Sequence, residues 1–466
     1  MSKPRIALAL KTLLLALLVA AAVSAKDGGG GKKKWVASWT TAPSNTFAGS
    51  SAPALVNLAF PFTPASPGVP ATVPQASNQT LRMIVKPDLW GNTMRVRISN
   101  YFGTGPVTFG RVAIGLQSFS GATVAGTNRT LTFAGKQFVT VAMGDRAVSD
   151  EVKLNWAGGD DGEDDDGRAS ALEGRNLAVS MFIPGKSGPM TFHGTALQES
   201  FLGKPDSGDH ALDDSDAAYP YETSSWFFVD AVDVLAAPDT RVLVGAGSSS
   251  VDGSITTPGN NDRFLNWMSR LLHAAYGNHV SVVNAGIGGD VAAIPDPTTN
   301  PPQIRPLREV LAERFDRDVL GASGVTDVIF YAGTNDFGDR IPAQQSIDSL
   351  RSMVEKLHRK GISAIGATLI SNVHQAGTTR DTYVAHDTIN QFILHSGVFD
   401  STADFYGATI DPGNIDPASG FPVLRADYQI HSDPNGTPDF LHLGRNGAQA
   451  EAKTLDIKFF APSKGR

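Results

Sequence analysis

The sequence contains no cysteine, which excludes disulfide bonds, thiol nucleophiles, thiolate zinc sites and lipids attached at cysteine. Charged residues make up only 18% of the 466 residues, and the net charge is −7. Nucleic-acid binding depends on clustered Lys and Arg that neutralise phosphates, so we expect no nucleic-acid partner. The composition also lacks the features of disorder or collagen, and its 48 Gly and 28 Pro predict a globular chain with many turns.

The N-terminus has no apolar run long enough to cross a membrane. Its apolar stretch, residues 13–23, is far shorter than the roughly 20 residues that a spanning helix needs. Basic residues precede this stretch and Val-Ser-Ala ends it, as in a secretory signal. We therefore predict a cleaved signal peptide over residues 1–25, a secreted or periplasmic protein, and no stable membrane anchor. The Gly- and Lys-rich residues 26–34 are interpreted as a linker.

Residues 35–237 show the alternation that is typical of half-buried strands. In residues 94–98, Met, Val and Ile alternate with two Arg, and residues 177–183 repeat this period of two. Gly or Pro interrupts the region at short intervals, which favours an all-β, sandwich-like domain. We expect Trp90 and Trp226 to lie in its core.

An acidic segment, residues 160–166, carries six acids in seven residues. A calcium loop is one interpretation, but Gly162 would then occupy a position where a carboxylate is required. The sequence favours a solvated loop between two strands.

Residues 238–466 have a different pattern, in which apolar runs alternate with helical segments. Four runs predict strands, at residues 241–247, 279–284, 325–332 and 362–369. Apolar residues at helical spacing predict helices over residues 262–276 and 343–360, the second followed by Gly361. This succession predicts an α/β domain with a flavodoxin-like, doubly wound parallel sheet, and so a chain with two cores. Ligands of such sheets bind at the carboxyl ends of the strands.

Three short motifs follow the first three predicted strands, where this rule directs attention, and a fourth stands near the C-terminus; each offers a chemical group. They are Gly-Ser-Ser-Ser-Val-Asp-Gly at 247–253, Asn-Ala-Gly-Ile-Gly-Gly-Asp at 284–290, Gly-Thr-Asn-Asp at 333–336 and Asp-Phe-Leu-His at 439–442. The glycines of the second motif would also suit a phosphate, but neither the Gly-Lys-Ser/Thr of a phosphate loop nor the Rossmann spacing is present.

Taken together, the four motifs resemble the GDSL hydrolases, also called the SGNH superfamily. The family's defining Ser, Gly, Asn and His fall on Ser249, Gly289, Asn335 and His442. The resemblance implies an SGNH hydrolase fold with Ser249 as nucleophile, His442 as base and Asp439 as the residue that orients the base. It further implies oxyanion donors from the backbone N–H groups of Ser249 and Gly289 and the side chain of Asn335.

The sequence departs from the family pattern at two positions. Ser248 replaces the Asp that normally precedes the nucleophile, and Leu443 replaces the Pro that commonly follows the catalytic His. Neither change removes a reacting group, although the neighbouring Ser250 becomes an alternative nucleophile. Gly447 falls where the family commonly has a Gly.

The resemblance implies an exported carboxylic-ester hydrolase that forms an acyl-enzyme. Its expected substrates are acyl or acetyl esters of small molecules or polymers, carbohydrates included. A lipase or acyltransferase of the same fold and a non-catalytic carbohydrate-binding protein are the alternatives. The strand-rich N-terminal region is similar to the module that precedes the hydrolase domain in a two-domain, secreted GDSL subgroup.

The other nine histidines show no convincing metal-ligand spacing. We assign them structural roles, His193 included, with His374 and His431 as the candidates for the rim of the pocket. We predict neither a metal nor a cofactor.

Overall fold

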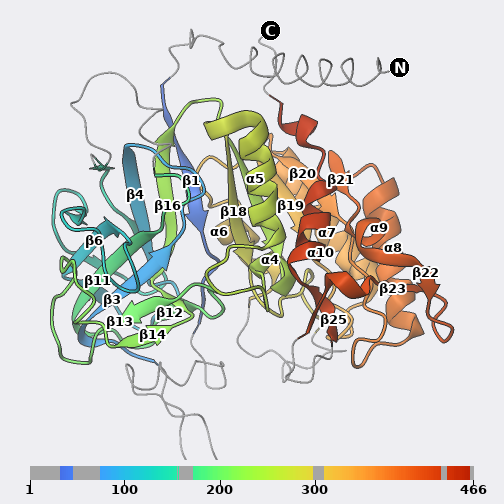
Figure 1. Ribbon diagram of the computed structural model, residues 1–466, viewed down its shortest axis with the longest axis horizontal. Coiled ribbons are helices and arrows are strands. Elements are labelled where there is room, and N and C mark those ends of the chain that lie inside the picture. Colours follow the sequence, from blue (N-terminus) through green and yellow to red (C-terminus); the bar gives the residue numbers. More distant parts are fainter. Residues whose placement is uncertain are drawn as a thin grey trace, which may run out of the picture. The chain divides into compact units, whose positions relative to one another are not determined.

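The computed structural model of the chain (Figure 1) describes residues 32–45, 74–154, 156, 172–296, 309–431 and 438–461. The predicted signal peptide, most of the predicted linker and the acidic segment 160–166 lie outside these residues. Residues Lys34–Arg466 form one compact unit. Lys34 itself corrects the linker prediction, because it pairs with Ala236 as the first residue of a strand.

Strands dominate the first part of this unit, and they pair in antiparallel fashion. One sheet has the order β1-β16-β4-β10, with β9 also pairing with β4; these strands are β1 (Lys34–Thr40), β16 (Val229–Ala236), β4 (Thr93–Ser99), β10 (Val152–Lys153) and β9 (Arg146–Val148). A second has the order β14-β13-β3-β11-β6-β7, made of β14 (Tyr221–Thr223), β13 (Ser200–Leu202), β3 (Ser77–Val85), β11 (Leu177–Lys186), β6 (Arg111–Leu116) and β7 (Arg129–Thr130). Smaller groups are β15 (Trp226–Phe227) with β12 (Thr191–His193) and β2 (Ser44–Asn45), and β5 (Val107–Phe109) with β8 (Val139–Val141).

The predicted alternation is visible in β4, where Met94, Val96 and Ile98 are fully buried and the two intervening Arg are only partly so. Trp90 and Trp226 are buried at 3% and 7% exposure, as expected for core residues.

A parallel sheet forms the second part of the unit, as predicted. Its order is β18-β17-β19-β20-β21, and its strands are β17 (Arg241–Gly247), β18 (Val280–Gly286), β19 (Asp327–Tyr331), β20 (Ser363–Ala367) and β21 (Ser401–Ala403). Numbered along this part of the chain, the order is 2-1-3-4-5, which is the flavodoxin-like order. Helices and hairpins complete this part: α4 (Ser249–Asp252), α5 (Phe264–Tyr276), α6 (Leu311–Asp318), α7 (Ala343–His358), α8 (Arg380–His395), α9 (Phe405–Thr409), α10 (Arg445–Lys453), β22 (Ile410–Ile415) with β23 (Pro422–Leu424), and β24 (Gln429–His431) with β25 (Pro438–Leu443).

Helices cover both faces of this sheet (Figure 1). Leu265 of α5 packs so closely on Gly245 of β17 that a methyl group there would overlap it. On the opposite face, Phe315 of α6 stacks on Phe330 of β19, and Ile393 of α8 packs on the neighbouring Gly366. The sheet is therefore doubly wound, with α5 on one side and α6 and α8 on the other.

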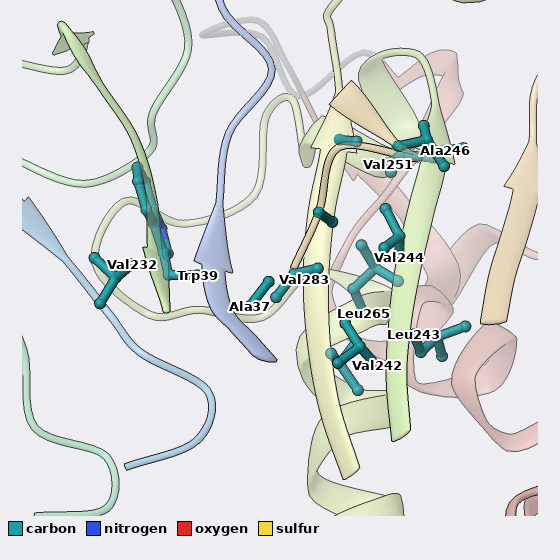
Figure 2. Packing of buried hydrophobic residues seen from close by; sticks show 14 of the residues in the cluster. Ala37, Trp39, Val232, Val242, Leu243, Val244, Ala246, Val251, Leu265 and Val283 are labelled. Atoms are coloured by element: carbon teal, nitrogen blue, oxygen red, sulfur yellow. The ribbon is translucent and has the colours of Figure 1, made fainter. Parts of the chain in front are cut away.

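The expectation of two separate cores is wrong, because one buried apolar cluster extends through both parts of the unit. Figure 2 shows Ala37 and Trp39 of β1 in the same cluster as Val283 of β18 and Val244 of β17. Hydrogen bonds join the parts at this contact, from Ser281 Oγ to the Ala37 carbonyl (2.7 Å) and from Ala37 N to a neighbouring loop carbonyl (2.8 Å). Strand β1 thus covers apolar side chains that the parallel sheet would otherwise expose.

Within the described ranges, no helix combines the length and the apolar character needed to cross a membrane.

Candidate active site

The carboxyl end of β17 presents Ser249, the residue predicted as nucleophile. The strand ends at Gly247, and α4 begins two residues later, so the chain reverses direction within a very short turn. A Cβ atom at Gly247 would collide with the backbone carbonyl of Tyr331 on β19, so only glycine allows this turn. The Ser248 carbonyl accepts the N–H groups of Val251 (3.1 Å) and Asp252 (2.9 Å), which fixes α4 against the strand end.

The structure brings three of the predicted residues into one hydrogen-bonded chain. His442 Nε2 lies 2.9 Å from Ser249 Oγ, and His442 Nδ1 lies 2.6 Å from Asp439 Oδ2. Asp439 and His442 belong to β25, and His442 lies 193 residues after the serine in sequence. Ser250, the alternative nucleophile, instead lines a small cavity with Tyr331 and Glu451.

Local backbone geometry orients the carboxylate of Asp439. Its Oδ1 accepts the backbone N–H groups of Leu441 (3.0 Å) and His442 (2.9 Å), which leaves Oδ2 for the imidazole. The intervening Phe440 has a φ of 55°, a left-handed conformation that non-glycine residues seldom adopt. The ring of His374 packs on Phe440 with 5.5 Å between ring centroids, which agrees with its expected place near this end of the site.

The pKa of Asp439 lies below its ordinary value. Partial burial alone would raise the pKa, but the hydrogen bonds from the His442 side chain and from the two backbone N–H groups stabilise the carboxylate more strongly. Asp439 is therefore ionised at neutral pH and favours the tautomer of His442 that carries its proton on Nδ1. In that tautomer, Nε2 is free to accept the proton of Ser249.

The predicted oxyanion donors lie on two loops at the same edge of the sheet. The loop after β18 bonds back to the nucleophile's strand through Ile287 N and the Gly247 carbonyl (3.2 Å). Gly289 has a φ of 76°, a conformation for which glycine is suited. Asn335 Nδ2 donates to the Asp290 carbonyl (2.8 Å), which joins the loop after β19 to the loop after β18. One amide hydrogen of Asn335 is left for another acceptor.

A buried arginine that no motif in the sequence marks supports this loop. Arg314 of α6 is 0% exposed and donates to the carbonyls of Gly247 (3.0 Å) and Ala285 (2.7 Å). Its guanidinium also pairs with Asp290 Oδ2 at 2.6 Å. One side chain thus holds together the ends of two strands and the loop after the second.

A second support reaches the site from the strand-rich part of the unit. Asp252, the last residue of α4, accepts the backbone N–H of Gly288 on Oδ2 (3.0 Å). Its other oxygen lies 2.9 Å from Nε2 of His193, which belongs to β12. This contact corrects the expectation of a purely structural role for His193.

His193 and Asp252 also line a cavity of about 300 Å³, together with Trp39, Trp226 and Lys86.

His386, another of the structural histidines, is buried on α8. Burial lowers its pKa to about 4, so it is neutral at physiological pH. Among the described residues, no group of three or more His, Asp or Glu side chains has the arrangement of a metal site.

One family model matches the part of the chain that contains these residues. Residues 246–450 match the model of the GDSL-like lipase/acylhydrolase family. No curated protein matches the chain.

The solved structures to which the chain is similar include a lipase/acylhydrolase from Enterococcus faecalis, with 17% identity, a TM-score of 0.34, and coverage of 48% of this chain and 100% of that one. A GDSL-like lipase from Bacteroides thetaiotaomicron has 15% identity and a TM-score of 0.32, and covers 47% of this chain and 88% of its own. A carbohydrate acetylesterase family member from Sinorhizobium meliloti has 13% identity and a TM-score of 0.33, with 47% and 99% covered.

The matched range contains Ser249, Gly289, Asn335, Asp439 and His442, and residues 246–450 form a domain of the GDSL-like lipase/acylhydrolase family.

Proposed function

We propose that the chain is a serine hydrolase of carboxylic esters, with Ser249 as nucleophile, His442 as general base and Asp439 as the residue that orients His442. The observation that carries this proposal is the hydrogen-bonded chain from Ser249 Oγ through His442 to Asp439, with contacts of 2.9 and 2.6 Å. A serine hydroxyl attacks a carbonyl near neutral pH only when a neighbouring base accepts its proton, and this arrangement provides that base.

The reaction proceeds in two halves. Ser249 Oγ forms a bond to the ester carbonyl carbon while its proton passes to His442 Nε2, and the tetrahedral intermediate then expels the alcohol, which takes that proton. Water repeats the sequence on the acyl-enzyme and releases the acid and free Ser249.

Negative charge develops on the carbonyl oxygen in both halves. The backbone N–H groups of Ser249 and Gly289 and the Asn335 amide are the donors that we assign to it. A single preorganised donor of this kind contributes roughly 2.7–4 kcal/mol to transition-state stabilisation.

Acyl or acetyl esters of small molecules or polymers are the proposed substrates, with carbohydrate esters among them. We further propose that the protein is exported, on the basis of the signal-like sequence of residues 1–25.

Hydrolysis of p-nitrophenyl esters of increasing acyl length tests the function, with Ser249→Ala and the adjacent Ser250→Ala as a matched pair. We expect Ser249→Ala to lower kcat by at least about a thousandfold. Ser250→Ala should retain most of the activity, since this side chain lies toward Tyr331. Wild-type turnover in Ser249→Ala would refute the assignment.

The same assay distinguishes the alternatives. Ester cleavage that transfers the acyl group to an added acceptor alcohol in preference to water would identify an acyltransferase. A folded wild type that cleaves no ester would favour a carbohydrate-binding protein.

A further inference from the structure

His193 is buried between two oxygen atoms that belong to different parts of the unit. Its Nδ1 lies 2.9 Å from the carbonyl oxygen of Ala42, and its Nε2 lies 2.9 Å from Oδ1 of Asp252. A carbonyl oxygen only accepts hydrogen bonds, so Nδ1 must carry a hydrogen. A second proton lies between Nε2 and Oδ1, so both ring nitrogens take part in hydrogen bonds.

The surroundings of this pair agree with a charged imidazole. Burial by itself would lower the pKa of His193, but the Asp252 carboxylate and the hydrogen bonds to Asp252 and Ala42 outweigh it and raise the pKa. The nearby Arg263 opposes this effect. The Trp226 ring covers one side of the imidazole, with 5.5 Å between centroids, and holds it in place.

Asp252 transmits the position of His193 to the reacting groups. It lies three residues after Ser249 in the same short helix, and its second carboxylate oxygen accepts the Gly288 N–H at 3.0 Å. Gly288 directly precedes Gly289, the backbone donor that we assign to the oxyanion. The orientation of the Asp252 carboxylate therefore sets the orientation of the peptide next to that donor.

The strand-rich part makes a second contact at the same place. Arg263 donates to the backbone carbonyl of Asp252 through Nε (2.5 Å) and to the Ala196 carbonyl through a terminal nitrogen (2.7 Å). His193 thus holds the Asp252 side chain directly, and residue 196 reaches the Asp252 backbone only through Arg263.

We propose that His193 is a positioning residue for ester hydrolysis: by holding the Asp252 carboxylate, it aligns the loop that carries the Gly289 oxyanion donor. The strand-rich part of the chain thereby completes the active site of the α/β domain. This inference rests on the proposed function of Ser249, Gly289 and His442.

Two substitutions at one position separate the Asp252 contact from the Ala42 contact. In His193→Gln the amide nitrogen occupies the place of Nε2 and can still donate to Asp252. In His193→Asn the shorter amide occupies the place of Nδ1, where it can donate to Ala42 but does not reach Asp252.

A misaligned oxyanion donor stabilises the transition state less well and changes substrate binding little. The loss should therefore appear in kcat rather than in KM. We expect His193→Asn to lower kcat by about ten- to a hundredfold with little change in KM, and His193→Gln to stay within about threefold of the wild type. The matched control is His210→Asn, because His210 is a more exposed histidine of the strand-rich part that pairs with Asp213 at 2.8 Å. It should leave kcat unchanged.

Rates should be measured per active site. A fluorophosphonate, which reacts covalently with the nucleophile, counts the folded sites. A purely structural role would lower the yield of active sites or the melting temperature in both His193 variants and leave kcat per site unchanged, which would overturn the inference. Equal losses of kcat in the Gln and Asn variants would also overturn it, because only the Asn variant lacks the Asp252 contact. Failure of the wild type to cleave esters would refute the proposed function instead.

Discussion

At the scale of single residues, Glu451 of α10 is a carboxyl group buried behind the site, in the cavity that Ser250 and His442 line. Burial raises its pKa from an ordinary 4.5 to about 8, and a hydrogen bond with Tyr331 only partly offsets this. Glu451 is therefore neutral in the folded protein at physiological pH. Its proton is retained there although the same group would be ionised in the unfolded chain.

This difference predicts how stability depends on pH. Between pH 4.5 and about 8 the folded state holds more protons at Glu451 than the unfolded state, so this residue lowers the free energy of unfolding as the pH rises, by up to about 1.4 kcal/mol per pH unit. Glu451→Gln removes that contribution, and its advantage over the wild type should grow from pH 5 to pH 7.5 in urea unfolding. The control is Glu355→Gln, an exposed residue of α7. Parallel curves for wild type and Glu451→Gln would contradict the prediction.

The residues of the site differ in how far the sequence reveals them. Ser249 and Asn335 stand in short motifs at the ends of predicted strands, so their meeting at one edge of the sheet follows from the topology. His442 follows no predicted strand, and only the family resemblance assigned it to the site. His193 lies 59 residues before Asp252 in the chain, and its strand β12 belongs to a different sheet from β17, the strand that precedes α4. Nothing in the local pattern around His193 encodes that contact, since it arises only when β12 packs against α4.

At the scale of elements, the turn from β17 into α4 depends on the absence of a side chain at Gly247. Gly247→Ala would force a Cβ atom against the Tyr331 carbonyl and the Val251 side chain, both in the packed interior. We expect a loss of about 1–3 kcal/mol in stability and a fall in kcat, because the displaced backbone carries Ser249. Urea unfolding and esterase assays check both effects.

Gly105→Ala serves as the matched control, because a Cβ there meets nothing within 4 Å. If Gly247→Ala were as stable and as active as Gly105→Ala, the close approach of β17 and β19 would not determine this turn.

The elements also show where the periodicity of a sequence is informative. Strand β17 has the predicted bounds, and α7 begins at the predicted residue but ends at His358, two residues early. Helix α6 was not predicted, because its buried face comprises Leu311, Arg314, Phe315 and Asp318. Two of those four residues are charged, so no apolar stripe marks the helix, and their burial depends on partners elsewhere in the fold.

At the scale of the whole molecule, buried ion pairs reinforce the shared apolar cluster. Asp230 of β16 pairs with Arg97 at 2.7 Å and with Arg146 at 2.8 Å, and Arg146 also approaches Asp318 of α6 at 3.4 Å. The contact between Arg146 and Asp318 crosses from the strand-rich part to the α/β part, so separation of the two parts would break it. The sequence suggested two independent units because its patterning changes near residue 238, but patterning does not show which faces pack together.

The continuous core predicts that Lys34–Arg466 unfolds in one cooperative transition in calorimetry, with ester cleavage lost over the same temperature range. A substitution that leaves a cavity in the core of the strand-rich part should then lower the temperature of both events. Val96→Ala, in the fully buried centre of β4, should cost about 2 kcal/mol and lower the temperature of unfolding and of thermal inactivation together by a few degrees. Val148→Ala, at a position 44% exposed on β9, should change neither. Two separate transitions, with inactivation unaffected by Val96→Ala, would show instead that the α/β part holds its active site without the support of β1 and β12.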